Sequence, residues 1–286
     1  MGSGNWPPEP GAVSWRAVRN RRTAERETPV TEIAIRRTDS PKTPPADETL
    51  AFGKVFTDHM FLMNYDEGKG WHSPRIEPYG NFSLDPATCV LHYGQAIFDG
   101  LKAFRGADGN IRLFRVPDHA KRLNRSAHYL CIPELPVDMV EASIRALVDV
   151  DQRWVPKLAG TSLYIRPTVI ATETFLGVHP SHSYLYYVIA GPVGAYYKEG
   201  MNPVRILASD THVRAVKGGL GAAKTAGNYA ASLFGAEEAQ KAGYTQVLWL
   251  DGVEHRYLDE VGTMNIMMRI GDEVVTPPLN GAILAG

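Results

Sequence analysis

Lys224 is the residue of this sequence whose surroundings most favour chemistry. It lies in the segment Gly218-Gly-Leu-Gly-Ala-Ala-Lys-Thr-Ala-Gly227, where most of its neighbours are glycine or alanine. Small side chains let a flat ring approach the backbone, and they offer the ammonium group few partners. Burial there would favour the neutral amine, which is the form that attacks a carbonyl carbon. The alternative is a solvated lysine on a surface loop, because most lysines are exposed.

The same segment differs by one residue from the phosphate-binding loop G-x-x-x-x-G-K-[ST]. Ala223 stands where that motif requires a glycine. A phosphate-binding loop also leaves a strand directly, whereas the polar stretch SDTHVRAVK separates this loop from the strand-like run VRILA. We therefore favour a lysine that attacks a carbonyl group over a nucleoside triphosphatase.

The sequence before the loop at 218–227 contains strand and helix patterns, and these elements must hold the loop in place. A β-type run at 31–36, a Pro-rich linker at 41–45 and short strands within 52–116, such as HMFLMNY and NIRLFRV, come first. A helix then starts at Pro117 and Asp118, and its apolar residues recur at steps of three and four: Ala120, Leu123, Ala127 and Leu130. A second helix is expected over about 137–154, followed by the strands SLYIRPTVI and YLYYVIA.

Behind the loop, a helix is expected from about Asn228, which could cap it, to Ala242, with Gly243 in the left-handed position past its end. The strands QVLWL and RYLDEV follow around an Asp-Gly turn at 251–252. The pattern predicts an α/β (α+β) chain with two domains. We expect a disordered tail at 1–30, a small N-terminal α/β domain at 31–190, a connection at 191–200 and a larger domain that starts at 201 and runs to 286.

Composition and charge limit the possible partners. Of the 286 residues, 44% are apolar and 21% are charged, and the formal net charge is −1. Such a balance provides no broad field for nucleic acid or an anionic membrane, and no apolar run approaches the roughly 20 residues that span a bilayer. Residues 1–31 contain no apolar core segment and so do not form a signal peptide. Two cysteines without metal-ligand spacing suggest a reducing compartment, so we expect a cytoplasmic protein without a metal site.

Several motifs in one order make a family resemblance specific. GGLGAAKTAGNYAASLF, QVLWLDG and LDEVGTMN follow FGKVFTDHMF, LHYGQAIFDGLKAFRG, RLFRVPDHAKRLNRSA, AGTSLYIRP, LGV and PVGAYY. Together they resemble the branched-chain aminotransferases of the fold-type IV pyridoxal-phosphate group, over roughly residues 31–286. The resemblance implies transamination of leucine, isoleucine and valine with 2-oxoglutarate, with pyridoxal 5'-phosphate as the cofactor.

The resemblance also implies roles for single residues. Lys224 would carry the cofactor covalently and move the proton of the substrate Cα, which requires a base of near-neutral pKa. Glu260 would pair with the pyridine nitrogen and keep it protonated, and Arg122 would bind the phosphate through its guanidinium. Three further residues would contact the cofactor: Tyr229, which would hydrogen-bond the phenolic oxygen, Arg214 and Thr263.

The substrate residues follow from the same resemblance. The apolar walls of the pocket would come from Phe52, Phe98, Tyr164, Tyr229 and Thr263. Arg166 would help with the carboxylate of the glutamate side chain. A second subunit would supply Tyr93, Leu176 and Val178, which makes the expected assembly a homodimer.

The sequence departs from the family at its end. Family members continue beyond LNGAILAG with a Gly-Val-Thr-Arg type segment and a later Gly-Thr-Ala type turn, which contact the phosphate, so we expect the larger domain to be truncated and the cofactor to bind poorly. The alternatives are a D-amino-acid aminotransferase or aminodeoxychorismate lyase of the same fold, or an inactive truncated remnant. The LYIRP, LGV and GAYY pattern argues against the first two.

Overall fold

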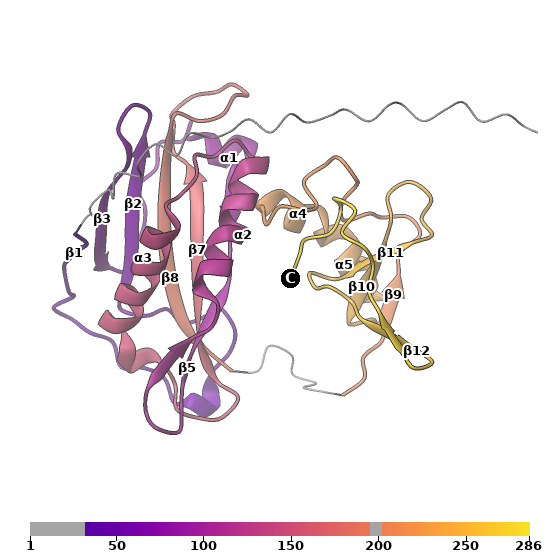
Figure 1. The fold of residues 1–286 in the computed structure, drawn as a ribbon, viewed down its shortest axis with the longest axis horizontal. Coiled ribbons are helices and arrows are strands. Elements are labelled where there is room, and N and C mark those ends of the chain that lie inside the picture. Colours follow the sequence, from indigo (N-terminus) through magenta and orange to yellow (C-terminus); the bar gives the residue numbers. More distant parts are fainter. Residues whose placement is uncertain (1–31, 195–201) are drawn as a thin grey trace, which may run out of the picture. The chain divides into compact units, whose positions relative to one another are not determined.

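The computed structural model describes residues 32–194 and 202–286 of the chain (Figure 1). The expected disordered tail at 1–30 lies outside the described residues, as does most of the expected connection at 191–200. The beginning of that connection belongs to a strand, β8, which runs to Val193. The division into two domains therefore stays a prediction.

An eight-stranded sheet fills the first part of the chain. Its order is β1-β3-β2-β8-β7-β5-β6, and β4 pairs with β7 next to the stretch that pairs with β5. Neighbouring strands are antiparallel, except that β1 runs parallel to β3. The strands are β1 (Ala34–Ile35), β2 (His59–Asp66), β3 (Gly70–Pro78), β4 (Ala96–Phe98), β5 (Leu101–Arg105), β6 (Ile111–Leu113), β7 (Ser162–Ala171) and β8 (Ser183–Val193).

The strand β8 is longer than its sequence suggests. Gly191 and Pro192 stand at the start of the connection that we predicted at 191–200, but both pair with β7. The fold requires glycine at this point because a Cβ on Gly191 would lie 2.1 Å from the carbonyl oxygen of Val55. A close approach of two backbones, and not a turn, explains the residue.

Two helices cover one face of this sheet, in front of β2, β8 and β7 in Figure 1. The predicted apolar stripe is confirmed in α2 (Val116–Tyr129), where Ala120, Leu123 and Ala127 are buried. The second helix, α3 (Val137–Val150), ends earlier than predicted and continues as a 3-10 turn at Gln152–Trp154. A short helix, α1 (Cys89–Tyr93), precedes β4.

The central strand β2 is buried on both faces. Phe61 and Met63 point into the large core beneath the two helices, whereas Met60 and Leu62 join a smaller apolar cluster on the opposite face. Successive side chains of a strand alternate between faces, so this nearly continuous apolar run is what a doubly covered strand needs.

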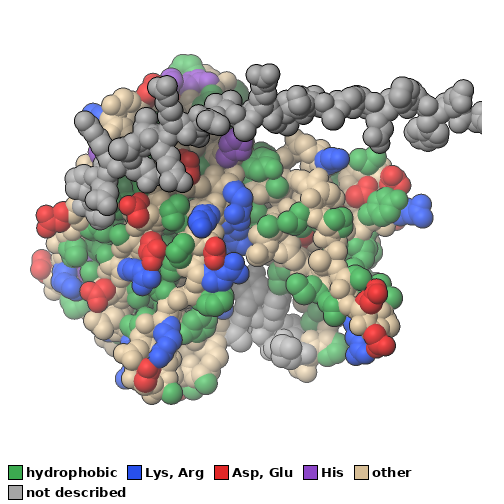
Figure 2. Space-filling view, in the orientation of Figure 1, with side chains coloured by type: hydrophobic (Ala, Val, Ile, Leu, Met, Phe, Trp, Pro, Cys, Tyr) green, Lys and Arg blue, Asp and Glu red, His purple; other side chains and the backbone are tan. Residues whose placement is uncertain are grey.

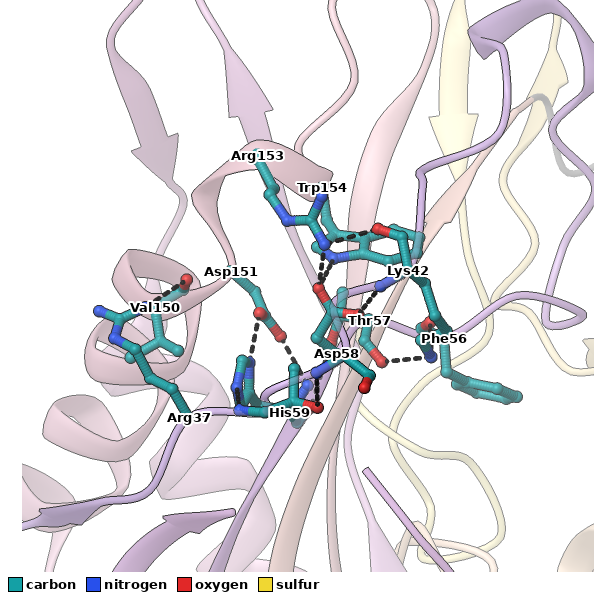
Figure 3. A network of polar contacts seen from close by, with 12 residues as sticks. Arg37, Lys42, Phe56, Thr57, Asp58, His59, Val150, Asp151, Arg153 and Trp154 are labelled. Carbon is teal, nitrogen blue, oxygen red and sulfur yellow. Dashed lines mark hydrogen bonds and ion pairs between the residues drawn. The ribbon is translucent and has the colours of Figure 1, made fainter. Parts of the chain in front are cut away.

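A buried polar network fixes the segment before β2 to the end of α3 (Figure 3). Asp58 accepts hydrogen bonds from the Trp154 indole (2.9 Å) and the Lys42 backbone (2.9 Å), and it pairs with Arg153. Next to it, His59 Nδ1 lies 2.7 Å from Asp151. The Thr38 backbone N–H donates to His59 Nε2 at 2.9 Å, so Nδ1 carries the proton and donates it to Asp151.

The second part of the chain forms a smaller sheet and a hairpin. The three-stranded sheet has the order β11-β10-β9, with β10 parallel to β9 and antiparallel to β11. The elements are β9 (Ile206–Ala208), α4 (Ala226–Ala231), α5 (Leu233–Lys241), β10 (Gln246–Leu250), β11 (Leu258–Val261), β12 (Met268–Ile270) and β13 (Glu273–Val275).

The helix predicted from Asn228 to Ala242 is two helices. The break follows Ser232, whose hydroxyl donates to the Tyr229 carbonyl at 2.8 Å and so competes with the helical pattern. Asn228 is not the cap that we predicted, because it lies inside α4. Gly243 does adopt the predicted left-handed conformation, with φ +82°.

The surface carries both charge signs. On the face shown in Figure 2, acidic and basic side chains are mixed over much of the surface, in keeping with the net charge of −1. Among the described residues, no helix is both long and apolar enough to cross a membrane.

Candidate active site

Backbone contacts on both sides hold Lys224 at the edge of the large sheet. Its carbonyl accepts the N–H of Phe98 at 3.0 Å, and its own N–H donates to the Ser126 hydroxyl at 2.9 Å. The next residue, Thr225, forms a bridge to β4 and donates its hydroxyl to the Ala96 carbonyl at 2.8 Å. The lysine loop is therefore anchored to β4 and α2, elements about a hundred residues earlier in the sequence.

Small residues and one amide keep the loop compact. A Cβ on Gly221 would lie 2.2 Å from the Ala282 carbonyl oxygen, so only glycine allows this approach. The side chain of Asn228 donates to the carbonyls of Leu220 and Ala223 at 2.7 and 2.8 Å. The asparagine that we predicted as a helix cap thus braces the loop that carries Lys224.

The Lys224 amine lies half-buried beside two neighbouring aromatic rings. Nζ is 2.6 Å from the Tyr229 hydroxyl and lies 5.1 Å from the ring centre of Phe98 and 5.2 Å from that of Tyr229. Burial lowers the pKa of the amine from 10.5 to about 8, and the positive charges of Arg122 and Arg166 act in the same direction. A substantial neutral fraction near physiological pH makes the amine a competent nucleophile and base.

Asp99 orders the arginine expected to bind phosphate. Arg122 donates to both Asp99 oxygens at 2.8 Å through Nε and Nη2, and His119 Nδ1 lies 2.8 Å from Oδ1. Burial alone would raise the pKa of Asp99, but these hydrogen bonds outweigh it and keep the pKa below its usual range. The remaining nitrogen, Nη1, donates to the Ala285 carbonyl at 3.3 Å, and among the described residues it makes no bond to a carboxylate, so this nitrogen is available to an anion.

The second charged pair joins Glu260 of β11 to Arg214. The two side chains are in direct contact and almost completely buried. Asn265 also donates to Glu260, at 3.1 Å, and Arg214 donates to the Ala282 carbonyl at 2.7 Å. Burial raises the pKa of Glu260 while the guanidinium opposes the rise. The carboxylate is thus fixed in place with a charged partner.

A mainly apolar cavity of about 200 Å³ lies beside the rings of Phe52, Phe56 and Tyr164. Arg166 donates to the Tyr164 hydroxyl at 2.8 Å, and its guanidinium stacks 4.5 Å from the Phe98 ring centre. Phe52 packs on Tyr164 with ring centres 5.0 Å apart. The cavity is lined mainly by apolar residues together with one charge: Phe52, Val55, Phe56, Arg166, Ile189 and Val193.

The other predicted residues lie apart from this cluster. Tyr93 ends α1, and Leu176 and Val178 lie between β7 and β8; all three are exposed, Val178 to 89%. The two segments are joined, because the Phe175 N–H donates to the Ala87 carbonyl at 3.1 Å. Thr263 lies in the turn after β11, with its side chain exposed.

Sequence reasoning did not single out Asp99, Ser126 or Asn265. The signal for Asp99 was available, since a carboxylate between the apolar runs QAIF and LKAF must find a partner if it is buried. No comparable signal marks Ser126 or Asn265. Their roles depend on contacts with Lys224 and Glu260 that form only in the fold.

The chemistry of these groups fits pyridoxal phosphate. A near-neutral amine matches its aldehyde, a buried carboxylate matches its ring nitrogen, and a phenol matches its ring hydroxyl. The Arg122 guanidinium, which Asp99 engages through Nε and Nη2, can offer Nη1 to the phosphate. The charges of Arg122 and Glu260 each act on the pKa of Lys224 and on the pKa of Tyr229, so these four side chains interact electrostatically.

Comparisons with known proteins agree with this chemistry. The family model described as amino-transferase class IV matches residues 96–286. The chain is 52% identical over 254 residues to branched-chain-amino-acid aminotransferase 2 of Bacillus subtilis (strain 168), a match that covers 89% of this chain and 70% of the relative. It is 48% identical over 264 residues to the branched-chain-amino-acid aminotransferase of Mycolicibacterium smegmatis, covering 89% and 72%.

Solved structures give the same answer. The crystal structure of Escherichia coli branched-chain amino acid aminotransferase matches with a TM-score of 0.66 and 25% identity, over 80% of this chain and 70% of that one. The T.th. branched-chain amino acid aminotransferase with pyridoxamine 5'-phosphate matches with a TM-score of 0.64 and 26% identity, over 78% and 70%. The α/β fold-type IV architecture expected from the sequence is confirmed, and the chain belongs to the class IV aminotransferases, which are pyridoxal-phosphate-dependent enzymes.

Proposed function

We propose that the protein transfers the amino group of leucine, isoleucine or valine to 2-oxoglutarate, with Lys224 as its catalytic residue. The observation that carries the proposal is the half-buried Lys224 amine, with a pKa lowered to about 8. Its Nζ lies 2.6 Å from the Tyr229 hydroxyl and 5.1 Å from the ring centre of Phe98, on which Arg166 of the cavity lining stacks. The relatives named as branched-chain aminotransferases support the substrate class.

Four side chains would hold the cofactor around this lysine. Lys224 is its covalent attachment point, and Tyr229 donates a hydrogen bond to its phenolic oxygen. Arg122 would offer Nη1, which now donates to the Ala285 carbonyl, to the phosphate while Asp99 keeps the guanidinium oriented. Glu260, aligned by Arg214, would pair with the ring nitrogen, and Thr263 would contribute from the turn after β11. When bound, pyridoxal phosphate supplies a carbonyl carbon for amine exchange and an electron-withdrawing ring.

The lysine itself would carry the proton. Once freed from the cofactor, the Lys224 amine would take the proton from the substrate Cα and pass it to the C4′ carbon of the cofactor, and it would make the reverse transfer with the second substrate. Efficient proton transfer needs a base whose pKa lies near the working pH, and burial provides this. The Tyr229 hydroxyl and the Phe98 ring restrict where Nζ can lie, which would keep it near the substrate Cα and the cofactor C4′.

The cavity suits two kinds of substrate side chain. Its walls, including Phe52 and Tyr164, would take a branched aliphatic group, with Phe98 packed against Arg166 of the lining. Arg166 would take the distal carboxylate of glutamate or 2-oxoglutarate. Because its guanidinium is already stacked on Phe98 and bonded to Tyr164, little side-chain entropy is lost when the carboxylate binds.

We also propose a homodimer that works in the cytoplasm. The exposed side chains of Tyr93, Leu176 and Val178 lie on two joined segments and would complete the pocket of a second subunit. The two free cysteines, Cys89 and Cys131, fit a reducing compartment.

A labelling experiment with a substrate panel tests the catalytic proposal. The chain is incubated with pyridoxal phosphate and borohydride, and the labelled lysine is identified by peptide mapping; we expect Lys224. Lys217→Ala, in the same loop, should keep the label and Lys224→Ala should lose it. Glutamate formed from 2-oxoglutarate is then measured with leucine, isoleucine, valine and D-alanine. Label on another lysine would refute the catalytic residue, and preference for D-alanine would refute the substrate class.

The dimer is tested separately by sedimentation equilibrium. We expect Leu176→Glu to shift the protein towards monomers, because it places a charge in the proposed interface. Val253→Glu is the matched control, since Val253 is 82% exposed in a different part of the chain and should leave the assembly unchanged. A parent protein that is monomeric and fully active would contradict the proposed assembly.

A further inference from the structure

Three potential metal ligands meet in the loop between β7 and β8, residues 172–182, outside the site of the lysine. The side chains of Glu173, His179 and His182 each offer an atom, and these atoms all lie within 4.8 Å of one another. The loop projects beyond the sheet at the top of Figure 1, and Figure 2 shows histidine side chains (purple) at that edge. Sequence spacing did not indicate this site, because Glu173 lies six residues before the first histidine.

The distances between these atoms are close to those of a metal site. Glu173 Oε1 lies 3.2 Å from His182 Nδ1 and 3.9 Å from His179 Nε2. A tetrahedral zinc ion with ligands at about 2.0–2.1 Å separates them by about 3.3 Å. The three side chains are partly exposed, so each has room to rotate towards a shared ion.

The protein also orients the ligands as metal sites do. His179 Nδ1 lies 2.8 Å from the Pro180 carbonyl, so that nitrogen carries the proton and Nε2 presents its lone pair. His182 Nδ1 donates a hydrogen bond to Glu173 at 3.2 Å, so a bound ion would take the place of this proton, while Nε2 faces the Glu67 carboxylate at 3.8 Å. The second oxygen of Glu173 accepts the His182 backbone N–H at 2.8 Å.

The base of the loop is already fixed. The Thr172 N–H donates to the Ser183 carbonyl at 2.9 Å, and the two hydroxyls are 3.1 Å apart. Glu173 and His182 directly follow these residues into the loop from either side, so two of the three ligands start from ordered backbone. Adding the third ligand, His179, then costs mainly the conformational entropy of ordering its side chain.

We propose that Glu173, His179 and His182 bind one divalent transition-metal ion of the zinc class. Two imidazoles and one carboxylate are a ligand set that suits zinc better than magnesium or calcium, which prefer all-oxygen sites. Three protein ligands leave the fourth tetrahedral position for water, and a hollow of about 450 Å³ lined by His179, His182 and Glu67 gives water access. The bound ion ties both ends of the loop to its middle.

Calorimetric titration of the purified chain with zinc chloride tests the proposal. We expect one ion per chain, released by a chelator, and binding weakened roughly tenfold or more by His179→Ala and by His182→Ala. His212→Ala is the matched control, because His212 lies 2.7 Å from the Glu238 carboxylate but has no second histidine beside it among the described residues. It should leave the titration unchanged.

A second readout reports geometry and does not depend on the variants. Cobalt(II) added to the parent chain should give the intense visible absorption of a tetrahedral site, and excess zinc should remove it. No zinc binding by the parent, equal binding by His182→Ala, or only the weak spectrum of octahedral cobalt would each overturn the proposal. In that case Glu173 and His182 form an ordinary ion pair.

Discussion

The buried amine of Lys224 should make the protein less stable at neutral pH than it would be without the charge. The fall of its pKa from 10.5 to about 8 corresponds to a cost of about 3 kcal/mol for keeping the amine protonated in the folded chain at pH 7. Because the folded pKa lies below the unfolded one, the unfolded chain binds more protons between these values. Stability therefore rises with pH through this window, and the cost falls to about 1 kcal/mol at pH 10.

Lys224→Met removes this cost while keeping a side chain of similar length. It also removes the hydrogen bond to Tyr229, worth about 1 kcal/mol. We expect the cofactor-free variant to be more stable than the parent by about 2 kcal/mol at pH 7 and nearly equal to it at pH 10. Urea denaturation of both proteins at the two pH values measures the difference.

Lys217→Met is the control for the removal of a lysine from this loop. Lys217 is exposed, so its replacement should change the free energy of unfolding by less than about 0.5 kcal/mol at either pH. If Lys224→Met is less stable than the parent by the same amount at pH 7 and pH 10, the amine is not held at a lowered pKa, and the argument for its reactivity fails.

Three further substitutions test other parts of the site. Asp99→Asn leaves a nearly buried guanidinium without its partner and should lower the free energy of unfolding by about 3 kcal/mol or more, measured with urea; an unchanged midpoint would refute the pairing. Glu260→Gln should keep the borohydride-trapped cofactor but slow leucine turnover severely, and near-normal turnover would exclude the proposed role. Gly221→Ala should destabilise the chain by about 1–3 kcal/mol because the new Cβ meets the Ala282 carbonyl at 2.2 Å, whereas Gly227→Ala, with open space around it, should not.

Local sequence patterns determined much of the framework. The three- and four-residue steps in α2 and the strand-like runs of β2, β7, β8 and β10 predicted these elements, because one face or both faces of each must be apolar to form the core. The small residues around Lys224 likewise predicted a loop that leaves room for a flat ring and offers the amine few partners nearby in the sequence. These are properties of neighbours in the chain, so the sequence alone contains them.

Contacts between distant residues were not accessible in this way. Gly191 looked like a turn residue and Asn228 like a helix cap, but the first makes room for the Val55 carbonyl and the second braces the lysine loop. Both errors have one origin. Glycine and asparagine suit turns and caps by their local conformation, and the sequence does not show that another segment needs the same residue.

The sequence by itself singled out Lys224, the family motifs around it and the helices and strands that position it. Only the tertiary structure decided that Asp99 holds Arg122, that Arg214 holds Glu260 and that Ser126 supports the Lys224 backbone from 98 residues away. It also brought Glu173 close to His179 and His182. The physical reason is that side-chain charges and hydrogen bonds act over a few ångströms in space, and the separation of two residues along the chain does not fix that distance.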